Sequence, residues 1–448
     1  MGLDPVLLSR LQFAITIGFH FLFPPLSIGL AWLLVIAEWR GWKRNDEDYI
    51  RLGKFFSKLL GLTFVMGVAT GITMEFQFGT NWAEYSKFVG DIFGAPLAAE
   101  AIFAFFLESS FLAVYILGRN RVSKAMHWFS VLMVAVGATI SAFWILVANS
   151  WQQTPSGFII RNGRAELTNF FDAVFNASTG PRFFHTVDAA LIAGAFFMAG
   201  VAGYLLLKNS ENRMARKAMT LAVIFGLIVS CVELFPFGHF HARQVALTQP
   251  EKFAAIEGLY DGQTKAPMVV LGLSKTDLSQ PGDPPAIRIP GLLSYFVYDD
   301  INAHVQGLNE FSPDELPPLA LTFYSFHLMV LLGMGFIGFT LLGVILLLIK
   351  SMWKSKWYLI LSLIAAPFPL IACQLGWISA EVGRQPWIVY KYLKTADAIS
   401  TVVPAGQILF SIVLFSLIYL LLGYLYIFLL VREVKHEAQV INPREAIV

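Results

Sequence analysis

The sequence is poor in charge and in cysteine. Charged residues make up only 14% of its 448 positions, whereas soluble domains carry about 25%. The formal net charge is +2, and no run of like charges suggests a nucleic-acid-binding tail. The two cysteines, Cys231 and Cys373, lie in apolar runs, and no Cys-x-x-Cys-His motif is present for covalent haem attachment. These absences exclude a soluble multidomain protein and a disulfide scaffold, and they leave no sign of a nucleic-acid partner.

Hydrophobic residues, by contrast, make up 56% of the chain and gather in long runs. A bilayer core about 30 Å thick needs roughly 20 apolar residues in helical conformation. Nine segments meet this requirement, at 11–37, 55–74, 92–117, 126–148, 182–207, 216–235, 318–350, 357–378 and 404–431. We therefore predict an all-α, polytopic membrane protein with nine transmembrane helices.

Lys and Arg set the expected orientation of these helices. If the N-terminus is outside, the inner loops and the tail hold 19 of the 32 Lys and Arg residues. We therefore predict an outer N-terminus and an inner C-terminus. The chain then divides into helices one to six (1–236), a Pro- and Gly-rich outer loop (237–317), and helices seven to nine with an inner tail (318–448). Within the loop, residues 250–257 are expected to form a short helix with Lys252 and Glu257 on different faces.

The first span carries a histidine beside two prolines. His20 is followed by Pro24 and Pro25. Since Pro24 lacks the N–H that would bond to the carbonyl of His20, the helix should kink just beyond the histidine. Such a kink opens room for a ligand. The alternative is a histidine that bonds to a neighbouring helix, because titratable groups at membrane depth are costly unless they are paired or functional.

The third span carries two carboxylates, Glu100 and Glu108. Eight residues of α-helix give about 12 Å of rise and an offset of about 80°. The two groups should therefore lie near one face, at the spacing of a water-bridged proton relay. A purely structural pair would need buried cations, and no Lys or Arg is expected inside any span.

Two further residues suggest a haem site. His185 lies at the outer start of the fifth span, and Met329 about a third of the way into the seventh. A lone Met is usually a packing residue, but with a histidine at like depth it would complete a His/Met haem site. His327, two residues from Met329, points about 200° round the helix and serves another face.

The segment 376–387, GWISAEVGRQPW, leaves the eighth span with a carboxylate, Glu381, close to a guanidinium, Arg384. Either these groups form a closed polar cluster, or they ligate and neutralise something buried. With an outer N-terminus, Glu381 falls in the outer half of the membrane together with His20, Glu100, His185 and Met329. That segregation favours the second interpretation: a row of cofactors near the outer surface, with Glu108 reaching inward for protons.

Other classes of membrane protein fit less well. A haem–copper oxidase needs a close pair of intramembrane histidines for copper, and the histidines here are not adjacent. A secondary transporter is expected to show an internal repeat or matched broken helices, and neither is visible. A haem-free proton-coupled transporter and a haem-bearing assembly or sensor subunit without turnover remain the alternatives.

The chain resembles one family along all nine spans, and four motifs are the most specific parts of the match. They are GRQPW at 383–387, GVATGITMEFQFGTNW at 67–82, FGAPL at 93–97 and LVAN at 146–149. The chain resembles subunit I of the cytochrome bd quinol oxidases. The resemblance implies two b-type haems, one d-type haem and no copper. It implies oxidation of membrane quinol at the outer face and reduction of O2 to water with inside protons. The result would be a membrane potential without pumping, in the cytoplasmic membrane of a bacterium or archaeon. It also implies a second large membrane subunit and allows small single-span subunits.

The resemblance assigns roles residue by residue. His185 and Met329 match the axial ligands of the low-spin b haem. His20 and Glu381 match the axial ligands of the other two haems, and which of them holds haem d is left open, with His20 the expected one. Glu100 would then be a sixth ligand or a proton donor beside it. A variant that holds b haems alone is also left open.

The remaining roles concern protons, electrons and quinol. Glu108 and Ser109 match an inner proton path, and Trp377 lies where electrons would pass between haems. Arg384, in the GRQPW segment, is counted with these catalytic groups. Lys252 and Glu257 match the quinol-binding positions of the outer loop. Two departures are visible: His327 replaces an Arg found in many members, and the loop is of the short type, so quinone preference does not carry over.

Overall fold

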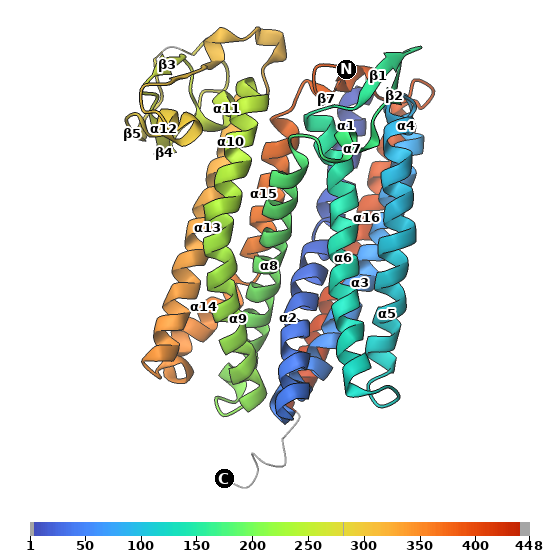
Figure 1. The fold of residues 1–448 in the computed structure, drawn as a ribbon, viewed down its shortest axis with the longest axis vertical. Helices are drawn as coiled ribbons and strands as arrows, with labels where there is room; N and C mark the ends of the chain where they lie inside the picture. Colours follow the sequence, from blue (N-terminus) through green and yellow to red (C-terminus); the bar gives the residue numbers. More distant parts are fainter. Residues whose placement is uncertain (1–3, 281, 440–448) are drawn as a thin grey trace.

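The computed structural model describes residues 4–280 and 282–439. Within these ranges, nine helical segments are long and apolar enough to cross a membrane, and they form an elongated bundle (Figure 1). The segments are Pro5–Arg44, Glu47–Thr80, Ala83–Leu117, Lys124–Gln153, Thr179–Lys208, Arg213–Thr248, Leu319–Leu348, Lys356–Val382 and Ala405–Gln439. They correspond one to one with the predicted spans, so the all-α polytopic fold is confirmed.

Five of these segments are single helices, and four are interrupted. The single helices are α3 (Glu47–Thr80), α6 (Lys124–Gln153), α8 (Thr179–Lys208), α13 (Leu319–Leu348) and α16 (Ala405–Gln439). The interrupted ones are α1 (Pro5–His20) with α2 (Phe23–Arg44); α4 (Ala83–Ala99), a π-helix (Glu100–Phe105) and α5 (Phe106–Leu117); α9 (Arg213–Val232), a π-helix (Glu233–Gly238) and α10 (His239–Thr248); and α14 (Lys356–Ala365) with α15 (Phe368–Val382).

The interruptions follow from proline. Helix α1 ends at His20 and α2 begins at Phe23, so the predicted break before Pro24 is confirmed. In the sixth span Phe235, next to Pro236, leaves helical geometry with φ −140° and ψ 115°, and the helix then resumes. This span therefore runs to Thr248, past its predicted end at 235, and the first part of the expected outer loop is helical.

The smaller elements cap the end of the bundle at which the chain begins (Figure 1). They are the hairpins β1–β2 (Phe158–Arg161, Arg164–Leu167), β4–β5 (Met268–Gly272, Ala286–Ile289) and β7–β8 (Trp387–Val389, Leu393–Lys394), the pair β3–β6 (Gln263–Thr264, His304–Val305), and the helices α7 (Phe170–Val174), α11 (Pro250–Glu257) and α12 (Leu292–Tyr298). Helix α11 confirms the short helix expected at 250–257. It stops at Gly258, whose φ of 63° is the left-handed conformation that glycine adopts readily at a helix C-terminus.

The main core lies where α2, α3, α8 and α9 pack together. Helices α2 and α8 cross at a pair of glycines. A Cβ atom on Gly194 would lie 2.3 Å from the carbonyl carbon of Gly29, and a Cβ on Gly29 would lie 2.3 Å from the carbonyl oxygen of Ala190. The two backbones are thus in direct contact, which is how small residues hold membrane helices together without a hydrophobic driving force between them.

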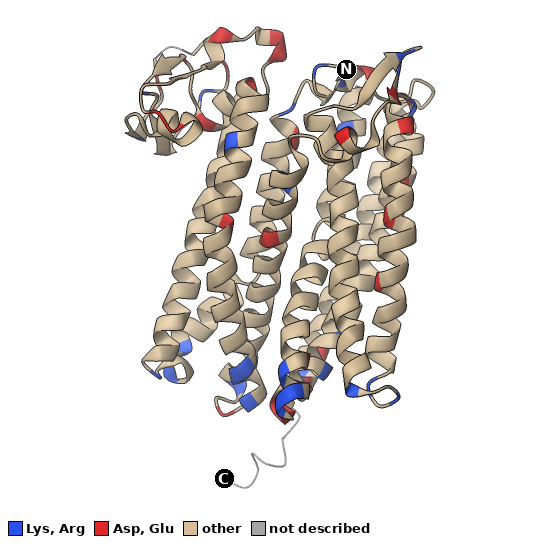
Figure 2. Ribbon diagram, viewed as in Figure 1, with Lys and Arg blue, Asp and Glu red and all other residues tan. Residues whose placement is uncertain are grey.

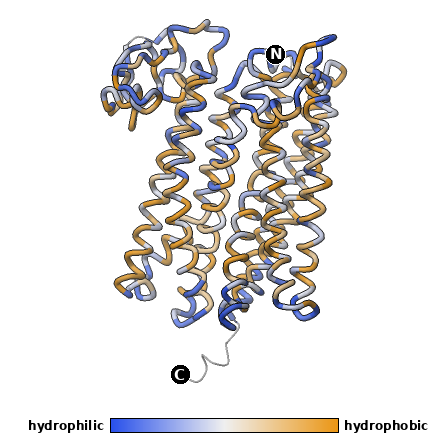
Figure 3. Tube along the Cα trace, in the orientation of Figure 1, coloured by the Kyte–Doolittle hydropathy of each residue, from blue (hydrophilic) through white to orange (hydrophobic). Residues whose placement is uncertain are grey.

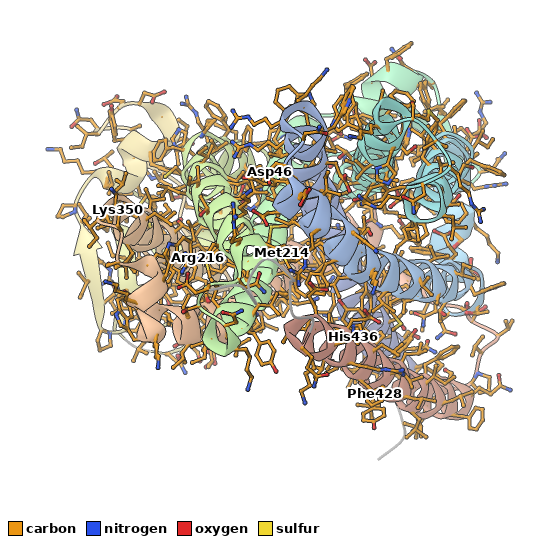
Figure 4. All side chains as sticks on the ribbon, turned by 90° about the horizontal axis from the view of Figure 1, so that it is seen from below. Asp46, Met214, Arg216, Lys350, Phe428 and His436 are labelled. Atoms are coloured by element: carbon orange, nitrogen blue, oxygen red, sulfur yellow. The ribbon has the colours of Figure 1, made fainter. Side chains whose placement is uncertain are left out.

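Charge and hydropathy divide the bundle by height. Figure 2 shows Lys and Arg gathered at the end from which the C-terminus emerges, and Figure 3 shows apolar residues along the length of the helices. Seen from that end (Figure 4), the turn at Asp46 lies beside the start of α9, which carries Met214 and Arg216. There Lys217 forms ion pairs with Asp46 and, at 3.0 Å, with Asp48. These pairs tie the α2–α3 turn to α9.

We predict that Gly194→Ala destabilises the protein, because the added methyl group would force α2 and α8 apart. Overpacking of this kind costs about 1–3 kcal/mol. The measurement is the melting temperature in detergent. Gly180→Ala is the matched control, since Gly180 also lies on α8 but a Cβ there meets no atom within 4 Å. Equal melting temperatures for the two variants would contradict the prediction.

Candidate functional site

Glu381, near the end of α15, is surrounded by hydrogen-bond donors. Its Oε2 atom accepts a hydrogen bond from Arg384 Nη2 at 2.5 Å. Its Oε1 atom accepts hydrogen bonds from Asn149 Nδ2 at 3.0 Å and from Gln153 Nε2 at 3.2 Å. The guanidinium of Arg182 lies 3.8 Å from the same oxygen. The sequence left two interpretations of the segment 376–387: a closed polar cluster, or ligands for a buried group. The protein's own side chains form a closed polar cluster around Glu381.

Arg182 is a buried cation in α8, only 6% exposed. Its Nη2 atom donates a hydrogen bond to Asn149 Oδ1 at 2.6 Å, so it faces the Glu381 cluster. The expectation that no Lys or Arg lies inside a span was therefore wrong. Arg182 stood at the edge of a predicted span, where arginine side chains ordinarily reach water, and that position concealed its role in the sequence.

His20, the last residue of α1, has one ring nitrogen engaged. Its Nδ1 atom lies 2.9 Å from the hydroxyl oxygen of Thr70, which itself donates a hydrogen bond to the carbonyl of Met66 at 2.7 Å. Because the hydroxyl proton of Thr70 is used on Met66, His20 Nδ1 must carry the proton that joins the two side chains. The Nε2 atom is then left with its lone pair, which is the arrangement of a histidine that ligates a metal. The histidine does bond to a neighbouring helix, and it keeps a free ligand atom as well.

Gly71 leaves space around this ring. A Cβ atom at position 71 would lie 3.2 Å from His20 Cε1 and 4.0 Å from its Nε2 atom. Thr70 and Gly71 are neighbours in the motif at 67–82. One residue therefore orients the imidazole and the next leaves room beside the atom that would bind a ligand.

His185, on α8, lies among polar atoms that lack partners. Its Nδ1 atom is 2.9 Å from Glu233 Oε1, although the ring is not aligned for a full hydrogen bond. Among the described residues, four buried polar atoms of this neighbourhood have no hydrogen-bond partner: His185 Nδ1, Asp188 Oδ2, Glu233 Oε2 and His241 Nε2. Buried polar groups are rarely left unpaired in native proteins, so the concentration of such atoms indicates a binding site for a further group.

Met329, on α13, presents its sulfur to α15. A Cβ atom on Gly376 would lie 2.7 Å from the Sδ atom of Met329, so the absence of a side chain at 376 is what admits the thioether. Trp377, the next residue of α15, is partly buried. Helix α15 packs against both α13 and α8, and so it bridges the helices that carry Met329 and His185.

His327 serves a different face, as its spacing from Met329 predicts. Its Nδ1 atom lies 3.1 Å from the carbonyl oxygen of Phe323, and its Nε2 atom lies 3.2 Å from the carbonyl oxygen of Val269 in β4. Its ring also stacks on that of Phe323, with 3.9 Å between centroids. His327 thus attaches the loop segment that carries β4 to α13.

The two carboxylates of the third span share a face. Glu100 accepts a hydrogen bond from Ser141 Oγ at 2.7 Å. Glu108 packs against Gly137: a Cβ atom added at Gly137 would lie 3.1 Å from the Cβ atom of Glu108. Positions 137 and 141 lie one turn apart on α6, so both carboxylates face that helix. The π-helix between them explains the alignment: it acts as one extra residue, so the offset is about 20° in place of the predicted 80° or so. The hydroxyl of Ser109 instead donates a hydrogen bond to the carbonyl oxygen of Phe105, away from the two carboxylates.

Lys252 and Glu257, on α11, are both 4% exposed. The Nζ atom of Lys252 donates hydrogen bonds to Ala380 O at 2.8 Å and to Gln153 Oε1 at 3.2 Å. Lys252 therefore belongs to the Glu381 neighbourhood. No ion pair joins Lys252 to Glu257 within the described ranges, which agrees with the prediction that they lie on different faces.

These residues fit a haem-binding site. Haem iron in proteins takes a neutral histidine nitrogen and a methionine sulfur among its axial ligands. The chain supplies two histidines whose Nδ1 atoms face an oxygen, a methionine whose sulfur lies against a glycine, and a set of unpaired buried donors and acceptors. Arg182, Asp188 and Glu233 were missed in the sequence, although each is a charged residue within a predicted span, which was the signal used for the others.

The comparisons with known proteins agree with one another. The chain matches the family described as cytochrome bd terminal oxidase subunit I over residues 8–438. It is 40% identical to the cytochrome bd ubiquinol oxidase subunit 1 of Bacillus subtilis (strain 168), over 98% of this chain and 95% of that protein. It is 34% identical to the cytochrome bd-II ubiquinol oxidase subunit 1 of Escherichia coli (strain K12), over 93% and 94%. The solved structure of the bd oxidase from Geobacillus thermodenitrificans is similar with a TM-score of 0.90 and 30% identity, over 97% of this chain and 99% of that one.

The match over nearly the whole chain confirms the resemblance predicted from the four motifs. The names of the relatives describe one subunit of an oxidase that acts on quinol. This multi-pass membrane protein therefore belongs to the family of subunit I of the cytochrome bd terminal oxidases, the haem-bearing catalytic subunits of quinol oxidases.

Proposed function

We propose that this chain oxidises membrane quinol near the end of the bundle that carries α11 and passes the electrons to O2. Two quinols supply four electrons, and O2 with four protons yields two water molecules. The observation that carries the proposal is the pair of half-buried histidines, His20 and His185, whose Nδ1 atoms each lie 2.9 Å from a protein oxygen. Histidines held in this way are oriented to ligate a metal.

The cofactors proposed are two b-type haems and one haem d, without copper. When bound, these groups would carry the electrons and bind O2. His185 and Met329 would hold the low-spin b haem, and His20 and Glu381 the other two. His20 would serve haem d, with Glu100 close to it as a sixth ligand or proton donor. Trp377, beside the Met329–Gly376 contact, would lie between haems.

Glu381 and Arg384 have a shared role in this proposal. The carboxylate already accepts hydrogen bonds from Arg384, Asn149 and Gln153. A carboxylate has about four lone-pair sites, so these three hydrogen bonds leave about one site with which it could ligate iron. Arg384 and Arg182 would then neutralise the ligand and keep it oriented.

Protons would reach the haems along α5 and the π-helix. Glu108 is 8% exposed and faces α6, as does Glu100, whose partner there is Ser141. Ser109 is proposed for the same path, although its hydroxyl now bonds to the backbone of its own helix. We infer that the end rich in Lys and Arg (Figure 2) is the inner one. Proton uptake from inside and release outside would then create a membrane potential without pumping, in the cytoplasmic membrane of a bacterium or archaeon.

Quinol would bind close to α11. Burial, together with the nearby Arg182 guanidinium, holds the pKa of Lys252 well below its usual range. Burial also raises the pKa of Glu257 to about 8. A carboxyl group with that pKa is poised near physiological pH to exchange a proton with a quinol hydroxyl. Lys252 also contacts the carbonyl of Ala380, next to Glu381, so the quinol positions and the proposed haem ligand are neighbours.

The family names describe subunit 1 of an oxidase with more than one subunit, so this chain has a partner. We propose that this partner is a second large membrane subunit, with small single-span subunits as further candidates. Large apolar side chains that are exposed on several spans support this, among them Phe76 at 71%, Phe106 at 67% and Phe428 at 49% exposure. They would face lipid or the partner.

A dithionite-reduced minus oxidised spectrum of the purified complex tests the proposal. We expect b-type bands together with a red-shifted chlorin band, and quinol-dependent O2 uptake. Bands of b haem alone would correct the haem d assignment. A preparation without haem bands would overturn the proposal in favour of a proton-coupled transporter, and haem without quinol-dependent O2 uptake would favour an assembly or sensor subunit.

We predict that Met329→Leu abolishes the low-spin b signal and leaves the other two haems in place, because leucine fills a similar volume but offers no ligand atom. The measurement is the same difference spectrum with haem quantification. Met334→Leu is the matched control on α13, since Met334 is 53% exposed. Retention of the low-spin signal in Met329→Leu would remove Met329 from the site.

We predict a pH-dependent stability difference between the native chain and Glu257→Gln. The folded state holds the Glu257 proton up to about pH 8, whereas an unfolded glutamate loses it near pH 4. The contribution of Glu257 to the free energy of unfolding is therefore fully present below the unfolded pKa and is lost as the pH rises toward about 8. Over that range the ratio of folded to unfolded protein falls by up to about tenfold per pH unit. Melting temperatures between about pH 5 and 8 should increasingly favour the Gln variant. Asp283→Asn, an exposed carboxyl of the same loop, is the control, and a difference that stays constant with pH would contradict the prediction.

A further inference from the structure

We propose that Glu233 is a positioning residue for His185 and that it makes this histidine an electron-rich iron ligand. The proposal rests on the proposed function, in which His185 binds the low-spin haem. Glu233 is not among the site residues that the family resemblance implies. The role follows from where the sixth span places this side chain.

Glu233 approaches His185 because the sixth span changes its geometry at that residue. Regular helix α9 ends at Val232, and the π-helix Glu233–Gly238 begins with Glu233 itself. Helix α8 packs against both α9 and this π-helix. The Oε1 atom of Glu233 lies 2.9 Å from His185 Nδ1, and the two side chains are 15% and 21% exposed. Distortions of this kind inside helices recur at functional sites.

The contact with Glu233 decides which ring nitrogen of His185 is free. A carboxylate at Nδ1 favours the tautomer that carries its proton there, because a carboxylate only accepts hydrogen bonds. The Nε2 atom then keeps its lone pair for a metal. The distance permits a hydrogen bond, and a small ring rotation would align it.

His20 provides the comparison within the same chain. Its Nδ1 atom donates to the neutral hydroxyl of Thr70 at 2.9 Å, the same distance as that between His185 and the carboxylate of Glu233. Both histidines are thus oriented through Nδ1, but only His185 faces an anionic partner. A carboxylate partner raises the basicity of the imidazole more than a hydroxyl does. An electron-rich ligand stabilises the oxidised iron and lowers the reduction potential.

This effect opposes that of Met329, since a His/Met pair raises the potential of a haem. Glu233 would bring the potential of the low-spin haem down, which favours onward transfer of electrons to the other haems. Other charged groups surround the pair: Asp188 and Arg182 lie one turn away from His185 on α8, and the His241 ring of α10 lies 5.0 Å from the His185 ring, centroid to centroid. Of the two carboxylates, Glu233 is the one that contacts the imidazole.

Redox titration of the low-spin b band in the purified complex tests the proposal. For Glu233→Gln we expect the haem to be retained and its reduction to be favoured at least tenfold, which is 59 mV for a one-electron couple. Asp188→Asn is the matched control, because it removes a buried carboxylate of the same cluster that does not contact the ring. We expect its shift to be clearly smaller. An unchanged potential in Glu233→Gln, or an equal shift in Asp188→Asn, would overturn the proposal.

If Glu233→Gln fails to retain the low-spin haem, Glu233→Asp is measured, because it keeps the charge. Recovery of the band supports an anionic positioning role, and its absence in both variants overturns it. His185→Ala separates this inference from the proposed function. Survival of the low-spin band in His185→Ala would refute His185 as the ligand, whatever the Glu233 variants show.

Discussion

A carboxylate that leaves water must regain its hydrogen bonds from the protein, and at Glu381 this requirement organises several elements at once. Arg384 comes from the same segment, Asn149 and Gln153 come from α6, and Arg182 comes from α8. Lys252 adds α11 through the neighbouring carbonyl of Ala380. Because a buried charge without partners costs far more than any one of these contacts contributes, the elements must assemble together. Helix α11, the segment with Glu381 and Arg384, and the membrane helices α6 and α8 are therefore held in one arrangement.

Much of the fold was predictable because the bilayer imposes a simple rule on the sequence. Nine apolar runs became nine helical segments within the described ranges, and the break after His20 followed from the missing N–H of Pro24. A proline such as Pro236 predicts the end of a helix, so the sixth span was expected to stop at 235. In the structure the helix resumes after this proline, and the span is longer. The length and hydropathy of a run do not show whether a helix restarts beyond a break.

The sequence offered candidate residues for the site but gave no indication of the side chains that contact them. Titratable side chains at membrane depth singled out His20, Glu100 and Glu381 as candidates, but no local pattern indicates that Thr70 will face His20 or that Ser141 will face Glu100. Such pairings depend on how helices far apart in the sequence are packed. Glu233 was overlooked for a related reason: it stands near the end of a predicted span, and its importance becomes visible only once α8 places a histidine opposite it.

The π-helix between Glu100 and Glu108 has a consequence for how this protein tolerates changes in chain length. It behaves as a single inserted residue in an otherwise regular helix. Deletion of one residue there would restore regular hydrogen bonding and shorten the span by only about 1.5 Å, and it would keep Glu108 within about 20° of Glu100, because seven residues of regular helix turn through about 700°. If the same eight residues formed regular helix without a deletion, Glu108 would instead turn by about 100° and leave the face that it shares with Glu100. The irregularity of this span is thus what allows a segment of this length to place both carboxylates on one face.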